Sequence, residues 1–190
     1  MSYPIHASLL FLINTIFDLY LFVLVIRIVL VYVRANYFDS ITQFIVKLTD
    51  FLVKPLRRVI PNVRNIELSS IVLALIIEMI KFICISMLTF GMPTIVGLFV
   101  LAIGDLLKLF LQTFFYAIIL QVILSWVQPQ SLGNRLLIQF TSPLMYPLQR
   151  IIPPISGIDI SPLIAIILLQ LVLILIANPI MTLGLNLAFY

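Results

Sequence analysis

The sequence predicts an all-α membrane protein with four transmembrane helices. Hydrophobic residues make up 63% of the 190 residues and charged residues 9%, against about 45–50% and about 25% in an average soluble domain. Four apolar runs are long enough to cross a hydrocarbon layer of about 30 Å, which takes about 20 helical residues. An internal repeat also groups these runs into two tandem units that share one orientation in the membrane.

The predicted elements follow the chain in two repeats, residues 1–91 and 92–190. The first repeat is expected to hold a span at about 8–33, an amphipathic helix at 38–54 and a span at 68–90. The second is expected to hold a span at about 104–127, an amphipathic helix at 131–146 and a span at 163–183. Because the first run has no Lys or Arg ahead of it, we interpret it as a retained span rather than a cleaved signal.

The repeat is visible when the sequence is aligned with itself, so that Pro147 falls 92 positions after Pro55. This offset aligns residues 49–69 with residues 141–161 without a gap, and repeats of this kind report on the whole architecture. The alignment contains nine identical pairs: Thr49/Thr141, Leu52/Leu144, Pro55/Pro147, Leu56/Leu148, Arg58/Arg150, Ile60/Ile152, Pro61/Pro153, Ile66/Ile158 and Ser69/Ser161.

Between the spans of each repeat lies a segment with the pattern of a surface helix. In FDSITQFIVKLTDFLVK (38–54), polar residues recur at helical spacing: Asp39, Gln43, Lys47, Asp50 and Lys54. Apolar residues occupy the opposite face: Phe38, Ile41, Phe44, Ile45, Leu48, Phe51 and Leu52. A helix of this kind lies in the membrane interface with its polar stripe in water. We expect helix starts at Asp39–Ser40 and at Ser131 or Asn134, whose side chains can accept from first-turn amides.

Prolines bracket the turn that follows each surface helix, in PLRRVIP and PLQRIIP. Pro55 and Pro147 lack the amide that a helix interior needs, so we expect them to end the helices. Pro61 and Pro153 favour extended geometry at the isoleucine before them. The repeated segments therefore predict a stiff turn that directs the chain back into the bilayer.

The distribution of Lys and Arg predicts the orientation, because cytoplasmic loops carry the excess of these residues. Both surface segments are basic, whereas the connection at 91–97 and the C-terminal tail carry no charge, so we expect cytoplasmic surface helices and periplasmic termini. Lys54, Arg57, Arg58 and Arg150 are our candidate contacts for anionic lipid headgroups or a membrane-protein partner. Nucleic acid is a poor candidate partner, because the chain has no polar domain to hold it.

Charged residues inside the apolar runs are expensive in lipid and need partners. At about 1.5 Å per residue, Asp18 and Lys81 lie at matched depth, and the long Arg27 side chain can bridge the smaller gap in depth to Glu78. We therefore predict the pairs Asp18–Lys81 and Arg27–Glu78, in competition with Glu78–Lys81 at i, i+3.

These pairs have two interpretations. They fix the register and orientation of the helices, or Asp18 and Glu78 line a path for a proton or a cation. Asp105 and Lys108, near the start of the predicted third span, are expected close to the outer surface and solvated.

The stretch ILSWVQPQSLGNRLLIQFTSPLMYPLQRIIPPISGIDISPLIAIILLQ (123–170) resembles the repeat unit of the YggT family of bacterial and plastid membrane proteins. The first half resembles a more basic version of the same unit, although Arg34 stands where the second unit has Trp126. The resemblance implies a bacterial inner-membrane location. It also implies roles such as osmotic-shock and potassium tolerance, a link with cell division, or assembly of membrane complexes.

The sequence contains no catalytic, cofactor or metal motif that we can identify. His6 and Cys84 are its only histidine and cysteine, and it has neither a nucleophile–base pair nor a glycine loop that would cradle a phosphate. We therefore expect a non-enzymatic inner-membrane factor that binds anionic lipid and membrane-protein partners. The alternative is a small potassium or proton transport protein that uses the charged residues inside the spans: Asp18, Arg27, Glu78 and Lys81.

Overall fold

The computed structural model describes residues 3–89, 91–152 and 159–189, and helices dominate them. The helices are α1 (Tyr3–Tyr32), α2 (Ser40–Arg57), α3 (Leu68–Thr89), α4 (Ile95–Val127), α5 (Leu132–Ile151), α6 (Ser161–Val172), the π-helical η1 (Leu173–Ala177) and α7 (Asn178–Phe189). By length and composition, α1, α3, α4 and the continuous α6–η1–α7 segment can each cross a membrane. The predicted all-α membrane protein with four spans is confirmed at this level.

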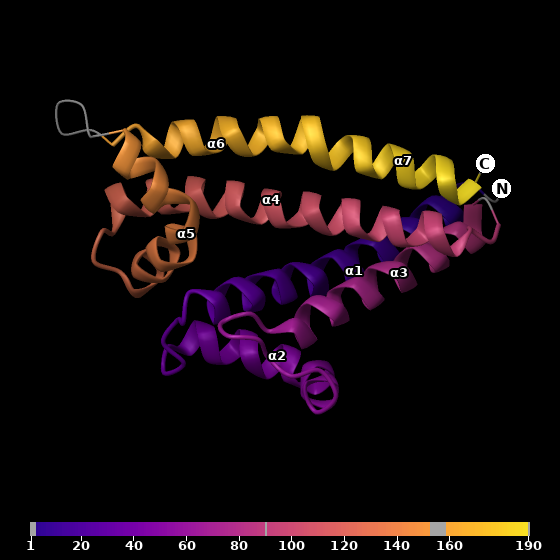
Figure 1. The fold of residues 1–190 in the computed structure, drawn as a ribbon, viewed down its shortest axis with the longest axis horizontal. Helices are drawn as coiled ribbons and strands as arrows, with labels where there is room; N and C mark the ends of the chain where they lie inside the picture. The colour runs from indigo at the N-terminus through magenta and orange to yellow at the C-terminus, as the bar shows by residue number, and fades with distance from the viewer. Residues whose placement is uncertain (1–2, 90, 153–158, 190) are drawn as a thin grey trace.

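Figure 1 shows the spans as a bundle with both chain termini at one end and with α2 and α5 at the other. We call the latter the surface-helix end. Three spans are longer than expected, because α1 begins at Tyr3 rather than near 8, α4 begins at Ile95 rather than near 104, and the last span reaches Phe189 rather than 183. Figure 1 also shows that the spans α1 and α3 diverge from the spans of the second half, α4 and α6–η1–α7, toward the surface-helix end.

Small residues allow α4 and α7 to pack backbone against backbone. A Cβ atom at Gly97 would overlap the backbone of Ala188, and a Cβ atom at Gly184 would lie 2.6 Å from the amide nitrogen of Leu101. Thr94, which caps α4, adds a hydrogen bond from its hydroxyl to the carbonyl of Leu187 at 2.6 Å. Close packing of this kind is how helices associate in lipid, where burial of apolar surface gives no driving force.

The π-helical turn in the last span has a covalent cause. Pro179 lies two residues after the end of η1. A proline ring has no amide and crowds the carbonyl four residues earlier, which here is that of Leu175 within η1. The wider π-turn makes room for the ring while the span continues, as π-turns within helices commonly do.

Helix α2 has three faces where the sequence pattern indicated two. One face packs against the protein and buries Thr42, Ile45, Thr49 and Val53. The predicted apolar face is split, because Ile45 belongs to this buried face whereas Phe44 and Phe51 are 65% and 83% exposed. The exposed phenylalanines thus leave an apolar stripe on the outside of the molecule.

The prolines differ in part from their expected roles. Pro55 and Pro147 do not end their helices: α2 continues through Pro55 to Arg57, and α5 continues through Pro147 to Ile151. The reason is that proline removes one amide bond, but its own φ is close to the helical value. Pro61 lies in the turn as expected, and Pro153 lies outside the described residues.

The ends of the surface helices agree better with the sequence. Ser131 caps α5 and accepts from the amide of Asn134 at 3.2 Å, whereas Asp39 at the start of α2 makes no side-chain capping bond. Ile152, which precedes Pro153, has the extended φ and ψ of −118° and 97°. The connection between α2 and α3 closes as a tight hairpin in which Val63 and Ile66 exchange backbone hydrogen bonds.

Candidate functional site

The first candidate site is a buried network that we call the Arg27 cluster: Arg27, Thr49, Asp50, Glu67 and Ser70. The guanidinium holds the Glu67 carboxylate with two bonds, Nε to Oε2 at 2.7 Å and Nη2 to Oε1 at 3.0 Å. Its Nη1 donates to Thr49 Oγ1 at 2.7 Å and to Asp50 Oδ1 at 2.8 Å. These bonds tie α1 to α2 and to the first turn of α3. Arg27 and Glu67 are 3% and 1% exposed, so the link is shielded from water.

The surroundings of Glu67 and Asp50 favour their charged forms. Burial raises the pKa of Glu67, but hydrogen bonds from Arg27 and Ser70 and the positive charges of Arg27 and Arg57 hold it below its ordinary value. Burial likewise raises the pKa of Asp50, and its bonds with Lys54 and Arg27 outweigh that effect and lower it. Both carboxylates therefore stabilise the fold in their ionised forms.

The expected pair Arg27–Glu78 is wrong. In the part of the chain that the structure describes, Arg27 pairs with Glu67 and Asp50, and Glu78 pairs with Lys81 in its own helix. The arginine side chain reaches toward the surface-helix end, where two carboxylates and a threonine accept its donors. Glu67 had a signal in the sequence, because the repeat aligns it with another acid, Asp159.

The second candidate site, the Lys81 cluster, contains Asp18, Glu78, Lys81, Asp105 and Lys108. Lys81 Nζ lies 2.9 Å from Asp18 Oδ1 and 2.6 Å from Asp105 Oδ2, and it also contacts Glu78 Oε1. The cluster thus joins α1, α3 and α4 in the interior of the spans. The structure brings together Asp18 and Lys81, the pair expected from their matched depth.

The expected position of Asp105 and Lys108 near the outer surface is wrong for Asp105. Its side chain is 19% exposed and bonds to Lys81, while Lys108 Nζ lies 3.9 Å from Asp105 Oδ1. The cluster holds three carboxylates against two ammonium groups. The described residues contain no group of three or more His, Cys, Asp or Glu suited to a metal ion.

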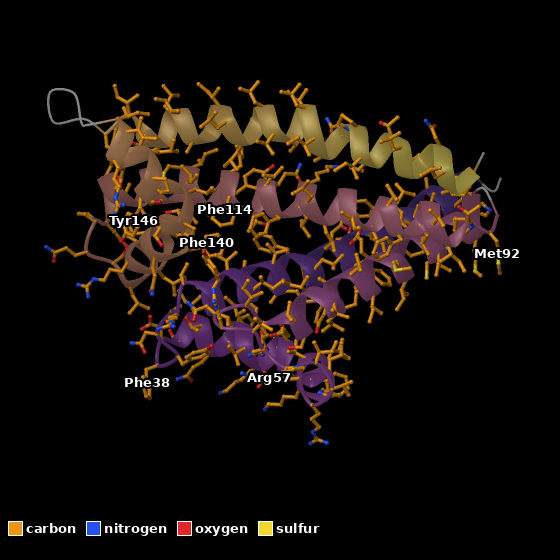
Figure 2. The ribbon with its side chains drawn as sticks, in the orientation of Figure 1. Phe38, Arg57, Met92, Phe114, Phe140 and Tyr146 are labelled. Carbon is orange, nitrogen blue, oxygen red and sulfur yellow. The ribbon has the colours of Figure 1, made fainter. Side chains whose placement is uncertain are left out.

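The third candidate site is the basic turn, defined as residues 54–66 with Lys54, Arg57, Arg58 and Arg64. The Lys54 and Arg57 side chains are 71% and 55% exposed, and Arg58 and Arg64 are exposed as well. Arg64 has a φ of 54°, which glycine adopts more readily than other residues. Figure 2 shows Arg57 at the end of α2 and Met92 at the opposite end of the spans.

Arg150 does not belong to the same patch. It is exposed in the last turn of α5, and Figure 1 places α5 and the turn after α2 in separate parts of the surface-helix end. The Arg58/Arg150 pair aligned by the repeat therefore presents two separate charges rather than one site.

The second half contains a different polar network at the positions aligned with the Arg27 cluster. Thr141, aligned with Thr49, is fully buried and lies 2.5 Å from Gln121 Oε1. Asp159, aligned with Glu67, accepts from the Ser161 amide at 2.9 Å and from Gln149 Nε2 at 2.8 Å. Burial raises the pKa of Asp159, but these bonds lower it below its ordinary value. The half without arginine at the position of Arg27 thus uses neutral donors.

Comparison with known proteins identifies relatives along most of the chain. A sequence model of the CCB3/YggT family matches residues 6–88 and again residues 100–180. Uncharacterized protein PA0392 of Pseudomonas aeruginosa is 37% identical over 178 residues, which cover 92% of this chain and 90% of the relative. A Vibrio alginolyticus protein named for its place in the proC 3′ region is 37% identical over 166 residues, covering 86% and 90%. Uncharacterized protein YggT of Escherichia coli K12 is 34% identical over 166 residues, covering 87% of each chain. No solved structure matches the chain.

Proposed function

Since this chain belongs to the CCB3/YggT family, we propose that it is a non-enzymatic factor of the bacterial inner membrane that binds anionic lipid headgroups and membrane-protein partners through its basic turn. One observation carries the proposal. Lys54, Arg57, Arg58 and Arg64 are exposed in one short segment, whereas Arg27 and Lys81 are almost fully buried in internal pairs.

The magnitude of the attraction is enough for a lipid preference. Each Lys or Arg near an anionic leaflet contributes about 1 kcal/mol. Lys54 shares its charge with Asp50 at 2.9 Å. Arg57 Nη1 lies 3.9 Å from Glu67 Oε1, but Arg27 already balances the charge of Glu67, so Arg57, Arg58 and Arg64 supply most of the effect, about 3 kcal/mol. This corresponds to an enrichment of roughly a hundredfold at low salt, and it weakens as ionic strength rises. The proposal places the surface-helix end in the cytoplasm, because this end carries the excess of basic residues.

The physiological role that we propose is organisation or assembly of membrane complexes, or tolerance of osmotic stress. The basic turn recruits anionic lipid, and the exposed apolar stripe of α2, with Phe44 and Phe51, rests in the same leaflet. A partner of this surface is a membrane protein with an acidic segment at the headgroup level.

The test extracts the protein from its native membrane in polymer nanodiscs and measures the ratio of phosphatidylglycerol to phosphatidylethanolamine that accompanies it. Arg57→Ala with Arg58→Ala is expected to lower this ratio several-fold, whereas Arg57→Lys with Arg58→Lys, which keeps both charges, should preserve it. Crosslinking in the same membranes shows whether partner capture follows the lipid ratio. An unchanged ratio and unchanged partners in the alanine variant would refute the proposal.

A second function, transport of a proton or potassium ion, is favoured by the Lys81 cluster. Three carboxylates surround Lys81 within the spans, and the Asp18 side chain is 51% exposed. The test measures ion flux into liposomes that contain the purified protein. Transport requires that Glu78→Gln abolish the flux while expression and thermal stability stay the same, and the absence of flux in the unaltered protein would dismiss it.

A further inference from the structure

A polar pocket of about 320 Å³ lies at the surface-helix end, where the two halves of the molecule meet. Gln139 of α5 donates from Nε2 to the carbonyl of Val33 at 3.2 Å, so the second half is bonded to the end of α1 beside this pocket. Its lining comes from the end of α1, from the hairpin and from α5: Tyr32, Val33, Asn65, Ser142, Pro143 and Tyr146.

The guanidinium of Arg34 is held against the lining of this pocket. Its Nε and Nη2 donate to Oδ1 of the lining residue Asn65, at 3.0 and 2.7 Å. A guanidinium has five N–H donors, so these two bonds leave others for a ligand. In the part of the chain that the structure describes, no carboxylate pairs with Arg34. Its charge therefore has only a neutral partner, whereas Arg27 is balanced by two acids.

The backbone next to the pocket is strained at two arginines. Arg34 follows the lining residue Val33 and has a φ of 52°, and Arg64 precedes the lining residue Asn65 and has a φ of 54°. A residue with a side chain adopts this left-handed conformation at an energetic cost, and such residues gather at ligand sites. The strain holds two positive charges, both exposed, at the edge of the pocket.

The lining of the polar pocket supplies hydrogen-bond donors and no acid. Asn65 Nδ2 and the hydroxyls of Tyr32 and Tyr146 can each donate a hydrogen bond. None of the lining residues carries a carboxyl group, so a cation would find no counter-charge there. Donors beside an arginine without an acidic partner match the oxygens of a phosphate. The pocket therefore fits an anion.

An apolar cavity of about 280 Å³ adjoins the polar pocket, because Tyr32 and Pro143 line both. Its other lining residues are Ile28, Val29, Ile66, Ile71, Phe110 and Phe114. Phe114 is 2% exposed, whereas Ile66 and Ile71 are 41% and 39% exposed, so the cavity has a buried floor and an open side. That side faces lipid in a membrane.

The polar and apolar spaces follow each other along the spans. Figure 2 shows Tyr146, which lines the polar pocket, nearer to the surface-helix end than Phe114, which lines the apolar cavity. Amphipathic surface helices occupy the headgroup level of a bilayer. The pocket for an anion thus lies at the level of lipid phosphates, and the apolar cavity lies below it, at the level of the acyl chains.

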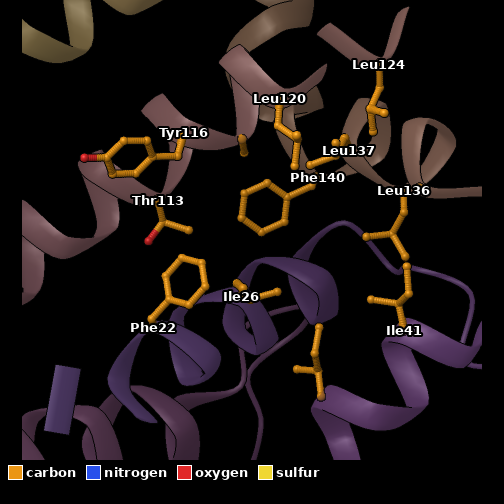
Figure 3. A pocket seen from close by; sticks show the side chains of 13 residues that line it. Phe22, Ile26, Ile41, Thr113, Tyr116, Leu120, Leu124, Leu136, Leu137 and Phe140 are labelled. Atoms are coloured by element: carbon orange, nitrogen blue, oxygen red, sulfur yellow. The ribbon is translucent and has the colours of Figure 1, made fainter. Parts of the chain in front are cut away.

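Another apolar cavity, of about 300 Å³, lacks such a charged neighbour. It lies where α1 and α2 face α4 and α5, and Figure 3 shows Phe22 and Ile26 opposite Phe140. The polar side chains in its lining are those of Thr113 and Tyr116, and the Thr113 hydroxyl already donates to the carbonyl of Leu109 at 2.7 Å. This lining indicates no particular ligand.

We propose that the polar pocket binds the phosphate of an anionic phospholipid, with Arg34 as its charged contact and one acyl chain in the adjoining apolar cavity. The inference rests on the proposed function, since it assigns one specific lipid site at the edge of the basic turn. A lipid bound there contacts α1 and the hairpin in the first half and α4 and α5 in the second. It therefore joins the two halves at the end where their spans diverge.

The experiment uses the full-length protein in phosphatidylcholine liposomes that contain phosphatidylglycerol with a photoreactive diazirine near the carboxyl end of one acyl chain. After illumination, mass spectrometry locates the adducts. Labelling is expected to concentrate on Ile71 and on residues 110–114, several-fold above Leu163 and Ile167, which are exposed on α6. The same chain on phosphatidylcholine should label the cavity several-fold less, because the polar pocket has no acid to pair with choline.

Arg34→Gly tests the charged contact. Glycine adopts a φ of 52° readily, so the variant is expected to fold while it loses the guanidinium. Labelling of residues 110–114 by phosphatidylglycerol should fall several-fold, to the level given by phosphatidylcholine. Lys47→Gln is the matched control, because it removes an exposed positive charge from α2, which lines neither the pocket nor the adjoining cavity. It should leave the labelling pattern unchanged.

Ile71→Phe tests the apolar cavity. The larger side chain takes up part of the space, and its exposed side leaves room for the ring, so labelling of residues 110–114 should fall several-fold. Ile80→Phe on the same helix is the control, because Ile80 is 45% exposed and lines neither space. It should leave the labelling of residues 110–114 unchanged.

Three results would overturn the proposal: labelling spread evenly over all spans, equal labelling by the two lipids, or labelling of residues 110–114 that survives Arg34→Gly. An excess of inorganic phosphate should not displace the labelled lipid. If it does, the pocket is a site for free phosphate and the lipid assignment is wrong. Arg57→Ala with Arg58→Ala should lower labelling by phosphatidylglycerol equally on every span, whereas Arg34→Gly should affect only the cavity. Failure of the proposed function and failure of this site therefore give different patterns.

Discussion

Replacement of Arg27 by methionine tests whether the Arg27 cluster holds the first half together. The change removes four strong hydrogen bonds and leaves Glu67, which is 1% exposed, buried without its main counter-charge. Breaking a buried ion pair by removing one partner costs about 3–5 kcal/mol. That is a loss of roughly two to almost four powers of ten in the folding equilibrium.

A second substitution, Glu67→Gln, tests whether the cost of Arg27→Met comes from the carboxylate that it leaves unpaired. Arg27→Met combined with Glu67→Gln removes the orphaned charge, so the double variant is expected to be more stable than Arg27→Met alone by about 1–3 kcal/mol. Lys54→Met is the control, because its 71% exposed side chain makes a surface pair with Asp50. Such pairs contribute about 0–1 kcal/mol.

The assay uses the single cysteine of the chain. Cys84 in α3 is partly buried, and its rate of modification by a maleimide in mixed micelles with rising denaturing detergent reports the separation of α3 from its neighbours. If Arg27→Met lowers the free energy of unfolding by less than about 1 kcal/mol, as expected for Lys54→Met, the Arg27 cluster does not hold the first half together. A double variant whose loss equals the sum of the two single losses would lead to the same conclusion.

Further outcomes follow from other parts of the structure. Arg64→Gly is expected to keep thermal stability within about 1 kcal/mol, since glycine suits its φ of 54°, while it lowers phosphatidylglycerol enrichment in nanodiscs. Gly97→Leu forces α4 from the backbone of α7 and should cost about 1–3 kcal/mol or more in the Cys84 assay, with Gly133→Leu as the tolerated glycine control. The contribution of Glu67 and Asp50 to stability is expected to be level above about pH 5. It should fall as the pH drops below the ordinary pKa values of 4.5 for Glu67 and 3.8 for Asp50, because the folded pKa values are lower. Circular dichroism during acid titration checks this sign, and a rise in stability as the pH falls below about 5 would contradict it.

The position of a charge along its helix was accessible from the sequence where helix lengths were nearly right. Counting residues placed Asp18 and Lys81 at the same depth in the membrane, and Lys81 Nζ lies 2.9 Å from Asp18 Oδ1. Asp105 was misplaced because the third span was expected to start near 104, whereas α4 begins at Ile95. The earlier start moves Asp105 three turns into the helix, at the depth of Lys81.

The choice among partners was not accessible in this way. Counting gives depth, but a side chain also has a direction around the helix and a reach along it, and these depend on how neighbouring helices pack. Arg27 therefore bonds to Glu67 and Asp50, which stand beyond its predicted depth, rather than to Glu78. The chain between α1 and α3 has to fold back under Arg27 before these acids can meet it.

The sequence by itself determined that this chain is helical, that it crosses a membrane and that four segments are apolar enough to do so, because these properties depend on composition and on hydrogen bonding within each segment. The tertiary structure alone decided that helices pass through Pro55 and Pro147, that α4 and α7 touch at Gly97, and that a cavity separates the two halves. These features arise from side chains distant in sequence that compete for the same space and the same donors, and no local pattern records the outcome of that competition.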